Sequence, residues 1–540
     1  MSYAAAIDQL SAMAPELHTQ PGQQRRKFSL TEIGALLSAL GDPHHRFPSV
    51  LIAGTNGKGS TAATLASILQ ASGLRAGLYT SPHLVRPNER IRLNGAEISD
   101  DAFARLYFQV DDASRRLVFE ERLAQLPSFF ETLTAMAFLH FAEAAIDIAV
   151  LEVGMGGRLD ATNIVAPILS IVTDISLDHT EWLGPTIAAI AREKAGILRA
   201  HGTLITLPQH PEANQVLGEV ATRLGTRAVS AVPYMPATPI SDSSRNATSS
   251  VTGHDRGTHP VGGSRAAEIQ GKNGALAPEL HSYPVQVLGS TITIDSPLHG
   301  NHQHRNIALA LAAAVALATH HNLPITPVSI EQGIRATRWP GRLEALTTPS
   351  FSTTLDAPGL ASETRGTQSY RGATQWILDV AHNPAGAWAL RAALRSEFGL
   401  GEGYSPPTAL IFSCLRDKPL AEMAQILFPL FDAIIFAPIN SPRATAMADL
   451  LAAAESVGVP ARAASSNAEA LSWAEVTGAS DTEGVGGFRP RNAVPSEEGA
   501  LAPAGPSRLI VVAGSVYLVG EIRPLLLARA AEPRGSEIAQ

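Results

Sequence analysis

The feature that most constrains this chain is an alternation of short apolar runs with longer stretches of helical period. The expected strands are Ser49–Ala53, Ala76–Thr80, Ile148–Val153, Leu169–Ile175 and Thr203–Leu207, separated by expected helices at Lys58–Ala71, Ser128–Ala145, Thr186–Arg199 and Pro211–Leu224. A second series has strands at Gln375–Ala381, Thr408–Cys414, Ala433–Pro438 and Leu509–Gly514, with helices at Pro384–Phe398, Pro419–Phe431 and the C-terminal end. Such alternation predicts parallel sheets covered by helices on both faces. We therefore expect an α/β protein with two doubly wound domains.

The length of 540 residues also favours more than one domain. We place the first domain at residues 1–338 and the second, smaller one at 342–540. Three stretches are rich in Ser, Thr, Gly and Pro and poor in aliphatic residues: Pro233–Leu280, Pro349–Thr374 and Ala479–Ser507. Such segments bury too little apolar surface to offset their ordering entropy, so we interpret all three as surface insertions or loops.

The charge balance excludes several classes of partner. The formal net charge is −8, so no basic excess is available for a nucleic acid or an acidic membrane surface. Apolar runs stay well short of the ~20 residues that cross a bilayer. A single cysteine, Cys414, excludes an intramolecular disulfide. The N-terminal segment lacks a basic, signal-like start. We expect a cytoplasmic protein, a monomer, that acts on small molecules.

The strongest local motif is Gly54-Thr-Asn-Gly-Lys-Gly-Ser60, which follows an apolar strand and opens a helix. Glycines let backbone N–H groups surround phosphate oxygens, and the helix N-terminus adds partial positive charge. Lys58 would supply a cation for the outer phosphates and Ser60 a hydroxyl for Mg²⁺. The interposed Gly59 departs from Walker spacing, which weakens a generic P-loop NTPase. A plain glycine-rich turn is the structural alternative, and a dinucleotide fold is disfavoured because Gly-x-Gly-x-x-Gly is absent.

Polar residues follow other predicted strands at the edge where open α/β sheets bind ligands. Glu152 ends one strand and can hold magnesium, whereas its alternative is a cap or an ion pair. Asp178 and His179 follow another strand, although His is an uncommon magnesium ligand. Lys194 lies in a predicted helix, where a lysine is usually a solvated charge.

Several motifs together resemble the folate branch of the Mur ligase superfamily. Besides the loop Gly54–Thr61, they are Thr80–Ile91, Leu151–Asn163, Asp174–His179, Arg192–Ile197, Trp339–Glu344, Leu378–Pro384 and Gly514–Glu521. The resemblance covers most of the chain outside the three insertions. It implies an ATP-binding N-terminal domain, a C-terminal ligase domain, ATP and Mg²⁺ (two ions) as cofactors, and a carbamylated Lys194 that offers a carboxylate-like metal ligand.

The same resemblance assigns individual residues. The metal set is Ser60, Ser81, Glu152 and His179, and the catalytic set is Lys58, Lys194 and His382. Nucleotide binding falls to Asn56, Gly57, Lys58, Gly59, Ser60, Asn306, Arg342 and Asp379. Substrate binding falls to Ser128, Phe129, Phe130, Glu131, Leu159, Asp160 and Ala161. Alternatives from residue type are a helix cap for Asn306, a core role for the two phenylalanines, and an Asn-Pro turn after Asp379. We also expect the loop Ser81–Arg90 to close over the nucleotide and the pterin.

By this resemblance, a carboxylate of dihydropteroate or of a tetrahydrofolate glutamate tail attacks the γ-phosphorus of MgATP, and the amine of L-glutamate then displaces phosphate. A folate-only synthase is the nearest alternative. A peptidoglycan-precursor ligase would be expected to carry a further domain of about a hundred residues before the phosphate loop. A non-catalytic nucleotide-binding module accounts for the loop but not for Glu152, His179, Lys194 and Asp379.

Overall fold

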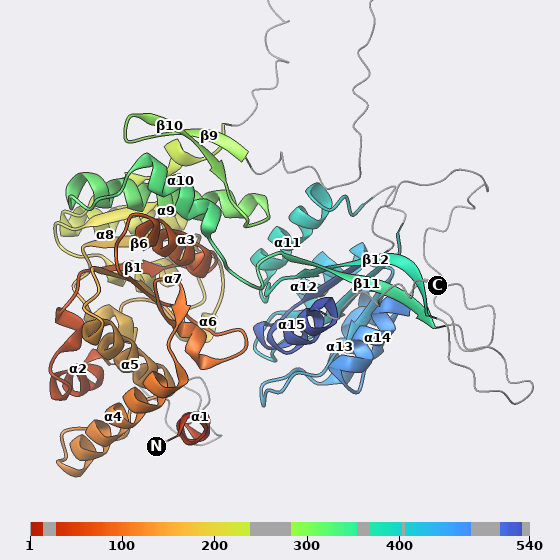
Figure 1. The fold of residues 1–540 in the computed structure, drawn as a ribbon, viewed down its shortest axis with the longest axis horizontal. Helices are drawn as coiled ribbons and strands as arrows, with labels where there is room; N and C mark the ends of the chain where they lie inside the picture. The colour runs from red at the N-terminus through yellow and green to blue at the C-terminus, as the bar shows by residue number, and fades with distance from the viewer. Residues whose placement is uncertain are drawn as a thin grey trace, which may run out of the picture.

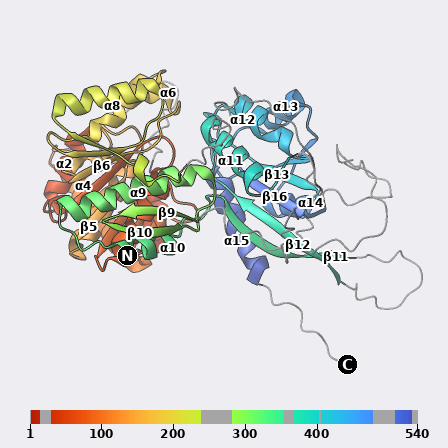
Figure 2. The same ribbon diagram turned by 90° about the horizontal axis from the view of Figure 1, so that it is seen from above.

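The computed structural model describes residues 2–13, 29–237, 282–353, 368–401, 406–476 and 508–531. Two lobes lie side by side, joined near residues 337–343 (Figures 1 and 2). Each lobe is built on a mostly parallel sheet, which confirms the predicted α/β class with two doubly wound domains. Among the described helices, none combines the length and the apolar character that crossing a membrane requires.

The N-terminal sheet has the order β4-β3-β2-β5-β1-β6-β7-β8 and is parallel except for β3 and β4. Its strands are β1 (Ser49–Ala53), β2 (Ala76–Tyr79), β3 (Ile91–Leu93), β4 (Ala96–Glu97), β5 (Ile148–Glu152), β6 (Leu169–Val172), β7 (Thr203–Thr206) and β8 (Arg227–Ser230). The central strands β1, β2, β5 and β6 are buried along their whole length, as expected for parallel strands covered on both faces.

Helices cover both faces of this sheet. One face carries α1 (Tyr3–Ala12), α2 (Leu30–Ala39), α4 (Asp100–Phe119), α5 (Phe129–Glu143), α7 (Ile187–Lys194) and α8 (Pro211–Leu224), with the short α6 (Thr180–Leu183) beside α7. The other carries α3 (Lys58–Ala71), α9 (Asn301–His320), α10 (Pro327–Ala336) and a hairpin of β9 (Ser282–Val287) and β10 (Ser290–Asp295). Short 3₁₀ turns lie at Pro43–His45, Pro87–Arg90, Ala161–Ile164, Ala195–Ile197 and Val232–Tyr234.

The C-terminal sheet has the order β11-β12-β16-β13-β14-β15, with only β11 antiparallel. Its strands are β11 (Glu344–Thr353), β12 (Gln368–Leu378), β13 (Thr408–Phe412), β14 (Ala433–Phe436), β15 (Ala461–Ala463) and β16 (Arg508–Ala513). One face packs against α11 (Pro384–Ser396), α12 (Leu420–Leu427) with its 3₁₀ extension Phe428–Leu430, and α13 (Met447–Val457). The other packs against α14 (Asn467–Val476) and α15 (Val516–Ala531).

The predicted insertion Pro349–Thr374 is longer than the segment that lies outside the sheet. β11 and β12 form a long hairpin that takes up both ends of Pro349–Thr374, so only residues 354–367 lie outside the described chain. β11 precedes β12, the strand predicted at Gln375–Ala381, so the C-terminal domain begins with a strand that the sequence analysis did not predict. Most of Pro233–Leu280 (from residue 238) and all of Ala479–Ser507 lie outside the described residues.

Candidate functional site

The predicted phosphate loop, Gly54–Ser60, follows β1 and opens α3, as the sequence analysis expects. Gly57 caps the helix with a left-handed backbone (φ +87°), and Ser60 is buried in its first turn. The Lys58 ammonium donates to the backbone oxygens of Gly54 and Thr55, both at 3.1 Å. A Cβ at Gly54 would lie 1.8 Å from Thr173 Oγ1, so only glycine fits there. The loop therefore places a cation over a turn of closely packed backbone.

Two contacts explain the other glycines of the loop. A Cβ at Gly57 would lie 2.1 Å from Asn306 Oδ1, and one at Gly59 would lie 2.8 Å from the Trp339 ring. Gly59 is thus the point at which the segment joining the lobes rests on α3, and a residue without a side chain leaves room there for the Trp339 ring. Asn306 belongs to the second turn of α9, whose N-cap is Gly300. The helix-cap alternative for Asn306 is wrong.

A second group surrounds the carboxyl end of β5. Glu152 is buried and accepts a hydrogen bond of 3.1 Å from the Ser81 N–H. Burial raises the pKa of Glu152, and the nearby Lys58 ammonium opposes that rise. Lys194 is also buried, so the alternative that it is a charge exposed to solvent is wrong. Its ammonium donates to the Gly54 backbone oxygen at 2.7 Å. Burial lowers the pKa of Lys194 to about 7, with Lys58 adding to the effect.

Asp178 and His179 lie at the junction of the two lobes. His179 adopts a left-handed backbone (φ +50°), and burial lowers its pKa to about 4. Asp178 accepts a hydrogen bond of 2.9 Å from Lys418 of the C-terminal domain. Burial tends to raise the pKa of Asp178, but His179 and Lys418 outweigh burial and hold it below its usual range. A second bridge joins Asn56 to Asn383 at 3.1 Å.

The C-terminal domain contributes Arg342, Asp379 and His382. Asp379 follows β12 and accepts from the N–H groups of Leu343 and Ala381 at 2.9 and 2.8 Å. Burial raises its pKa and lowers that of Arg342, while each charge partly offsets the shift of the other. Burial lowers the pKa of His382 to about 4, and its Nδ1 lies 2.8 Å from the Val380 carbonyl, so Nε2 is the ring nitrogen left for a ligand.

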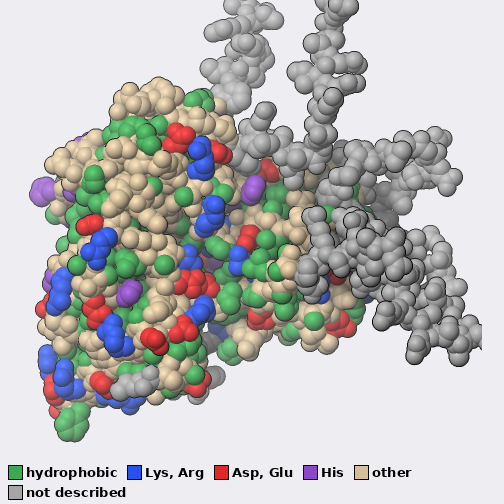
Figure 3. Space-filling model, in the orientation of Figure 1, with side chains coloured by type: hydrophobic (Ala, Val, Ile, Leu, Met, Phe, Trp, Pro, Cys, Tyr) green, Lys and Arg blue, Asp and Glu red, His purple; other side chains and the backbone are tan. Residues whose placement is uncertain are grey.

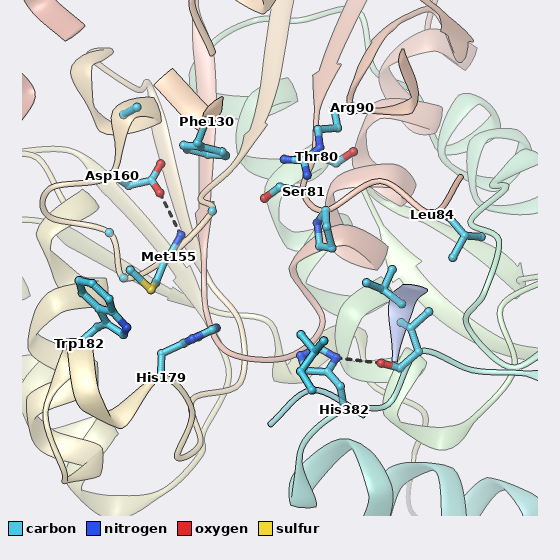
Figure 4. A pocket seen from close by; sticks show the side chains of 18 of the residues that line it. Thr80, Ser81, Leu84, Arg90, Phe130, Met155, Asp160, His179, Trp182 and His382 are labelled. Carbon is cyan, nitrogen blue, oxygen red and sulfur yellow. Dashed lines mark hydrogen bonds between the residues drawn. The ribbon is translucent and has the colours of Figure 1, made fainter. Parts of the chain in front are cut away.

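A cavity of about 420 Å³ opens between these groups (Figure 4). Predicted residues in its wall are Ser81, Ser128, Phe130, Glu131, Leu159, Asp160, Ala161, His179, Arg342 and His382. Phe130, Met155 and Trp182 give one part of the wall an apolar character. The C-terminal part carries the Arg342 cation, beside Lys418 and Arg443, which are paired with Asp178 and Asp417. The cavity thus suits a flat, partly apolar molecule that bears an anionic group.

Some residues predicted to bind the substrate also stabilise local structure. Ser128 and Glu131 form a capping box at the start of α5, with bonds of 2.8 and 3.2 Å. Asp160 caps the turn at Ala161–Ile164 and accepts from the Met155 N–H at 3.0 Å, and burial raises its pKa. Phe129 lies outside the cavity wall, with the Arg90 guanidinium 5.1 Å above its ring. The predicted phosphate-loop residues are likewise not among its wall residues.

Sequence reasoning did not single out several wall residues: Arg90, Trp182, Trp339, Lys418, Arg443 and Tyr517. Arg90, Trp339 and Tyr517 fall inside the motifs that carried the resemblance, so that signal was present. Lys418 and Arg443 lie in the loops after β13 and β14, at the carboxyl edge of the second sheet, where ligands are expected. On the face shown in Figure 3, acidic and basic side chains are interspersed rather than gathered into one basic area.

Two α/β domains, with a glycine-rich loop between the first strand and the following helix of the N-terminal one, are the arrangement of a Mur-type ligase. Residues 52–314 match the Mur ligase middle domain, and residues 363–484 match the Mur ligase glutamate ligase domain.

The curated relatives make the assignment more specific. The dihydrofolate synthase/folylpolyglutamate synthase of Bacillus subtilis is 31% identical over 93% of this chain and 95% of its own. The folylpolyglutamate synthase of Lacticaseibacillus casei is 30% identical over 91% and 93%. The chain therefore belongs to the Mur ligase family of acid–amino-acid ligases, in the branch of the dihydrofolate and folylpolyglutamate synthases.

Solved structures agree with this assignment. A Mycobacterium tuberculosis folylpolyglutamate synthase complexed with ADP and AMPPCP is 29% identical, with a TM-score of 0.70 over 97% of this chain and 99% of that one. Escherichia coli FolC in complex with DHPP and ADP is 25% identical, with a TM-score of 0.68 over 98% of each chain.

Proposed function

We propose that this ligase adds L-glutamate to dihydropteroate, giving dihydrofolate, and to the glutamate tail of reduced folates. The observation that carries the proposal is the shared cavity, whose wall joins Phe130 and Asp160 of one domain to Arg342 and His382 of the other. The relatives named for both activities, and the similar structures solved in complex with ADP or AMPPCP, support it.

ATP would bind with its phosphates on the loop Gly54–Ser60. Backbone N–H groups and the Lys58 ammonium would face the phosphate oxygens there. Asn306 of α9 lies against Gly57, and the Arg342 charge acts on Glu152 together with that of Lys58. Asp379 would contact the ribose. Because most of these groups are fixed by packing or hydrogen bonds, little reorganisation is needed as negative charge develops.

The chemistry has two steps. A carboxylate oxygen of the acceptor attacks the γ-phosphorus, the bond to the bridging oxygen of ADP breaks, and an acyl phosphate forms. The neutral amine of glutamate then attacks the acyl carbon and loses a proton, the C–O bond breaks, and inorganic phosphate leaves. Lys58, Arg342 and Lys418 would balance the anionic charge, with His382 next to the transferring group. Closure of the lobes would keep water away from the acyl phosphate.

The donor set fits a magnesium site. Ser60, Ser81 and Glu152 supply hard oxygen atoms, which Mg²⁺ prefers, while the nitrogen of His179 is a less common ligand. Burial raises the pKa of Glu152, and a bound divalent cation would favour the ionised carboxylate. Bound Mg²⁺ would neutralise charge on the phosphate oxygens. Lys194 lies beside this group as a buried amine, which makes it the lysine suited to carbamylation.

The acceptor test separates the two activities. Purified protein is incubated with MgATP, labelled glutamate and either dihydropteroate or tetrahydrofolate, and we expect a labelled product with each acceptor. Product with tetrahydrofolate alone would leave a folate-only synthase. Lys58→Ala should abolish incorporation, whereas Arg75→Ala, which removes an exposed cation after the same helix, should not. Near-normal turnover of Lys58→Ala would overturn the assigned phosphate loop.

A further inference from the structure

The segment that joins the lobes has a constrained backbone. Gly341 has φ +72°, and Leu343, which is fully buried, has φ +49°. A left-handed backbone is unfavourable for a residue with a side chain and persists only where surrounding contacts hold it. Arg342 lies between these two residues, half-buried and in the wall of the cavity. The direction of the Arg342 side chain therefore depends on whatever holds its neighbours.

Three hydrogen bonds hold them. The Gly341 N–H donates to Glu344 Oε2 at 2.9 Å, and the Val380 N–H donates to the Gly341 oxygen at 3.0 Å. The Leu343 N–H donates to Asp379 Oδ2 at 2.9 Å. Glu344 thus fixes one side of Arg342 and Asp379 the other.

Glu344 is itself held by Arg523 of α15. The guanidinium donates through Nε to both carboxylate oxygens, at 3.0 and 2.8 Å, and through Nη2 to Oε1 at 2.7 Å. The two side chains are 22% and 18% exposed, so solvent screens the pair only in part. Such a fork fixes the orientation of a carboxylate better than a single contact does.

A backbone contact brings the N-terminal domain to the same helix. A Cβ at Gly520 would lie 1.9 Å from the Leu84 oxygen, so the loop after β2 crosses α15 one turn before Arg523. Glu89 accepts from the Leu84 and Val85 N–H groups, both at 2.7 Å, and lies within electrostatic reach of Arg523. Arg523 therefore lies where the loop, the joining segment and the C-terminal helix meet.

We propose that Arg523 is a positioning residue for the ligase reaction, which acts through Glu344 and the Gly341 N–H to aim Arg342 at the transferring phosphoryl group. The proposal rests on the role given to Arg342 under the proposed function. Arg523 need not touch a substrate for this: it is not among the residues that line the cavity, whereas Arg342 is.

The test is a double-mutant cycle. Steady-state ATP-dependent glutamate incorporation is measured for Arg523→Met, Arg342→Ala and the double variant. A misplaced phosphate-binding group costs turnover, so Arg523→Met should lower kcat by about tenfold or more while the KM for glutamate stays within about twofold. In the Arg342→Ala background the same change should have no further effect on kcat, because the residue to be positioned is gone.

Arg529→Met is the matched control. Arg529 lies one and a half turns further along α15 and pairs with Glu475 at 2.8 Å, away from the joining segment. Its kcat should stay at the wild-type value. If Arg523→Met melts well below the control, Glu344→Gln replaces it in the cycle. The glutamine keeps an oxygen that accepts from the Gly341 N–H but weakens the contact with the Arg523 guanidinium. Its effect on kcat should also vanish in the Arg342→Ala background.

The outcomes are distinct. If Arg523→Met and Glu344→Gln multiply the loss caused by Arg342→Ala, or leave kcat unchanged, the positioning proposal is overturned while the proposed function stands. If Arg342→Ala keeps full activity, the role of Arg342 fails and the positioning proposal fails with it.

Discussion

At the scale of single residues, Gly59 couples the phosphate loop to the segment between the lobes. Alanine is the better helix former by about 1 kcal/mol, yet a Cβ here would meet the Trp339 ring at 2.8 Å. We expect Gly59→Ala to lower kcat/KM for ATP by about tenfold or more, because either the ring or the helix start must move. Steady-state kinetics at varied ATP measures this.

A second helical glycine offers the control. A Cβ at Gly218 in α8 would have no neighbour within 4 Å. Gly218→Ala should therefore raise the free energy of unfolding by up to about 1 kcal/mol and leave kinetics unchanged. Equal kinetics for the two variants would contradict the role given to the contact with Trp339.

Lys194 carries the second prediction at this scale. With a pKa of about 7, roughly half of its amine is neutral at pH 7, against roughly 1 in 3000 for an ordinary lysine. Carbon dioxide adds only to the neutral amine, so at fixed dissolved CO₂ the carbamate should increase as pH rises from about 6 to 8. Carbon-13 NMR with labelled bicarbonate would detect a signal that Lys194→Ala lacks. A signal that survives this substitution, or does not change with pH, would exclude the assignment.

At the scale of elements, periodicity located the strands and helices that bury a continuous apolar face. β1, α3 and α8 have the predicted bounds, and β5 ends one residue early. The long helix α4 was missed, because its charged residues mask the buried side that Phe103, Leu106 and Val110 define. The β9–β10 hairpin was missed although β9 alternates buried and exposed residues, because β9 is short, contains Pro284 and directly follows the segment Pro233–Leu280. β11 was obscured by the Ser/Thr-rich composition of its second half.

The N-terminus of α5 separates a structural from a functional role for Ser128. Loss of the cap should cost about 1 kcal/mol of stability in Ser128→Ala, measured by denaturant unfolding. Ser99 also accepts a hydrogen bond from the third residue of its helix, α4, and lies away from the cavity, so Ser99→Ala should cost a similar amount. If Ser128 also binds the acceptor, Ser128→Ala alone should raise the KM for dihydropteroate. Equal KM values in the two variants would leave Ser128 as a cap only.

At the scale of the whole molecule, the residues of the candidate site were predicted mainly from the resemblance to a known family rather than from residue patterns alone. Residue type alone favoured a solvated Lys194 and left His179 open, and both roles depend on neighbours far away in the chain. The contacts of Trp339 with Gly59, of Arg523 with Glu344 and of Lys418 with Asp178 join segments whose separation no periodic pattern encodes. Motifs marked most of these segments, but only the fold shows which residue each one meets.

The pair Lys418–Asp178 ties the lobes together, with side chains only 6% and 11% exposed. Lys418→Met would leave Asp178 buried without its partner, at a cost of about 3–5 kcal/mol, and Lys418→Met/Asp178→Asn should recover part of that loss. Because the lowered pKa of Asp178 keeps its carboxylate ionised, the pair stabilises the fold fully above the ordinary pKa of about 3.9, and this stabilisation is lost progressively as pH falls from there through the lowered pKa.

We expect calorimetry of Lys418→Met at neutral pH to show separate melting of the two domains. Arg105→Met, which breaks an ion pair between α4 and α5 whose side chains are 53% and 40% exposed, should leave the transition as in the wild type, since an exposed pair contributes about 0–1 kcal/mol. One unshifted transition in Lys418→Met would show that other contacts hold the lobes together.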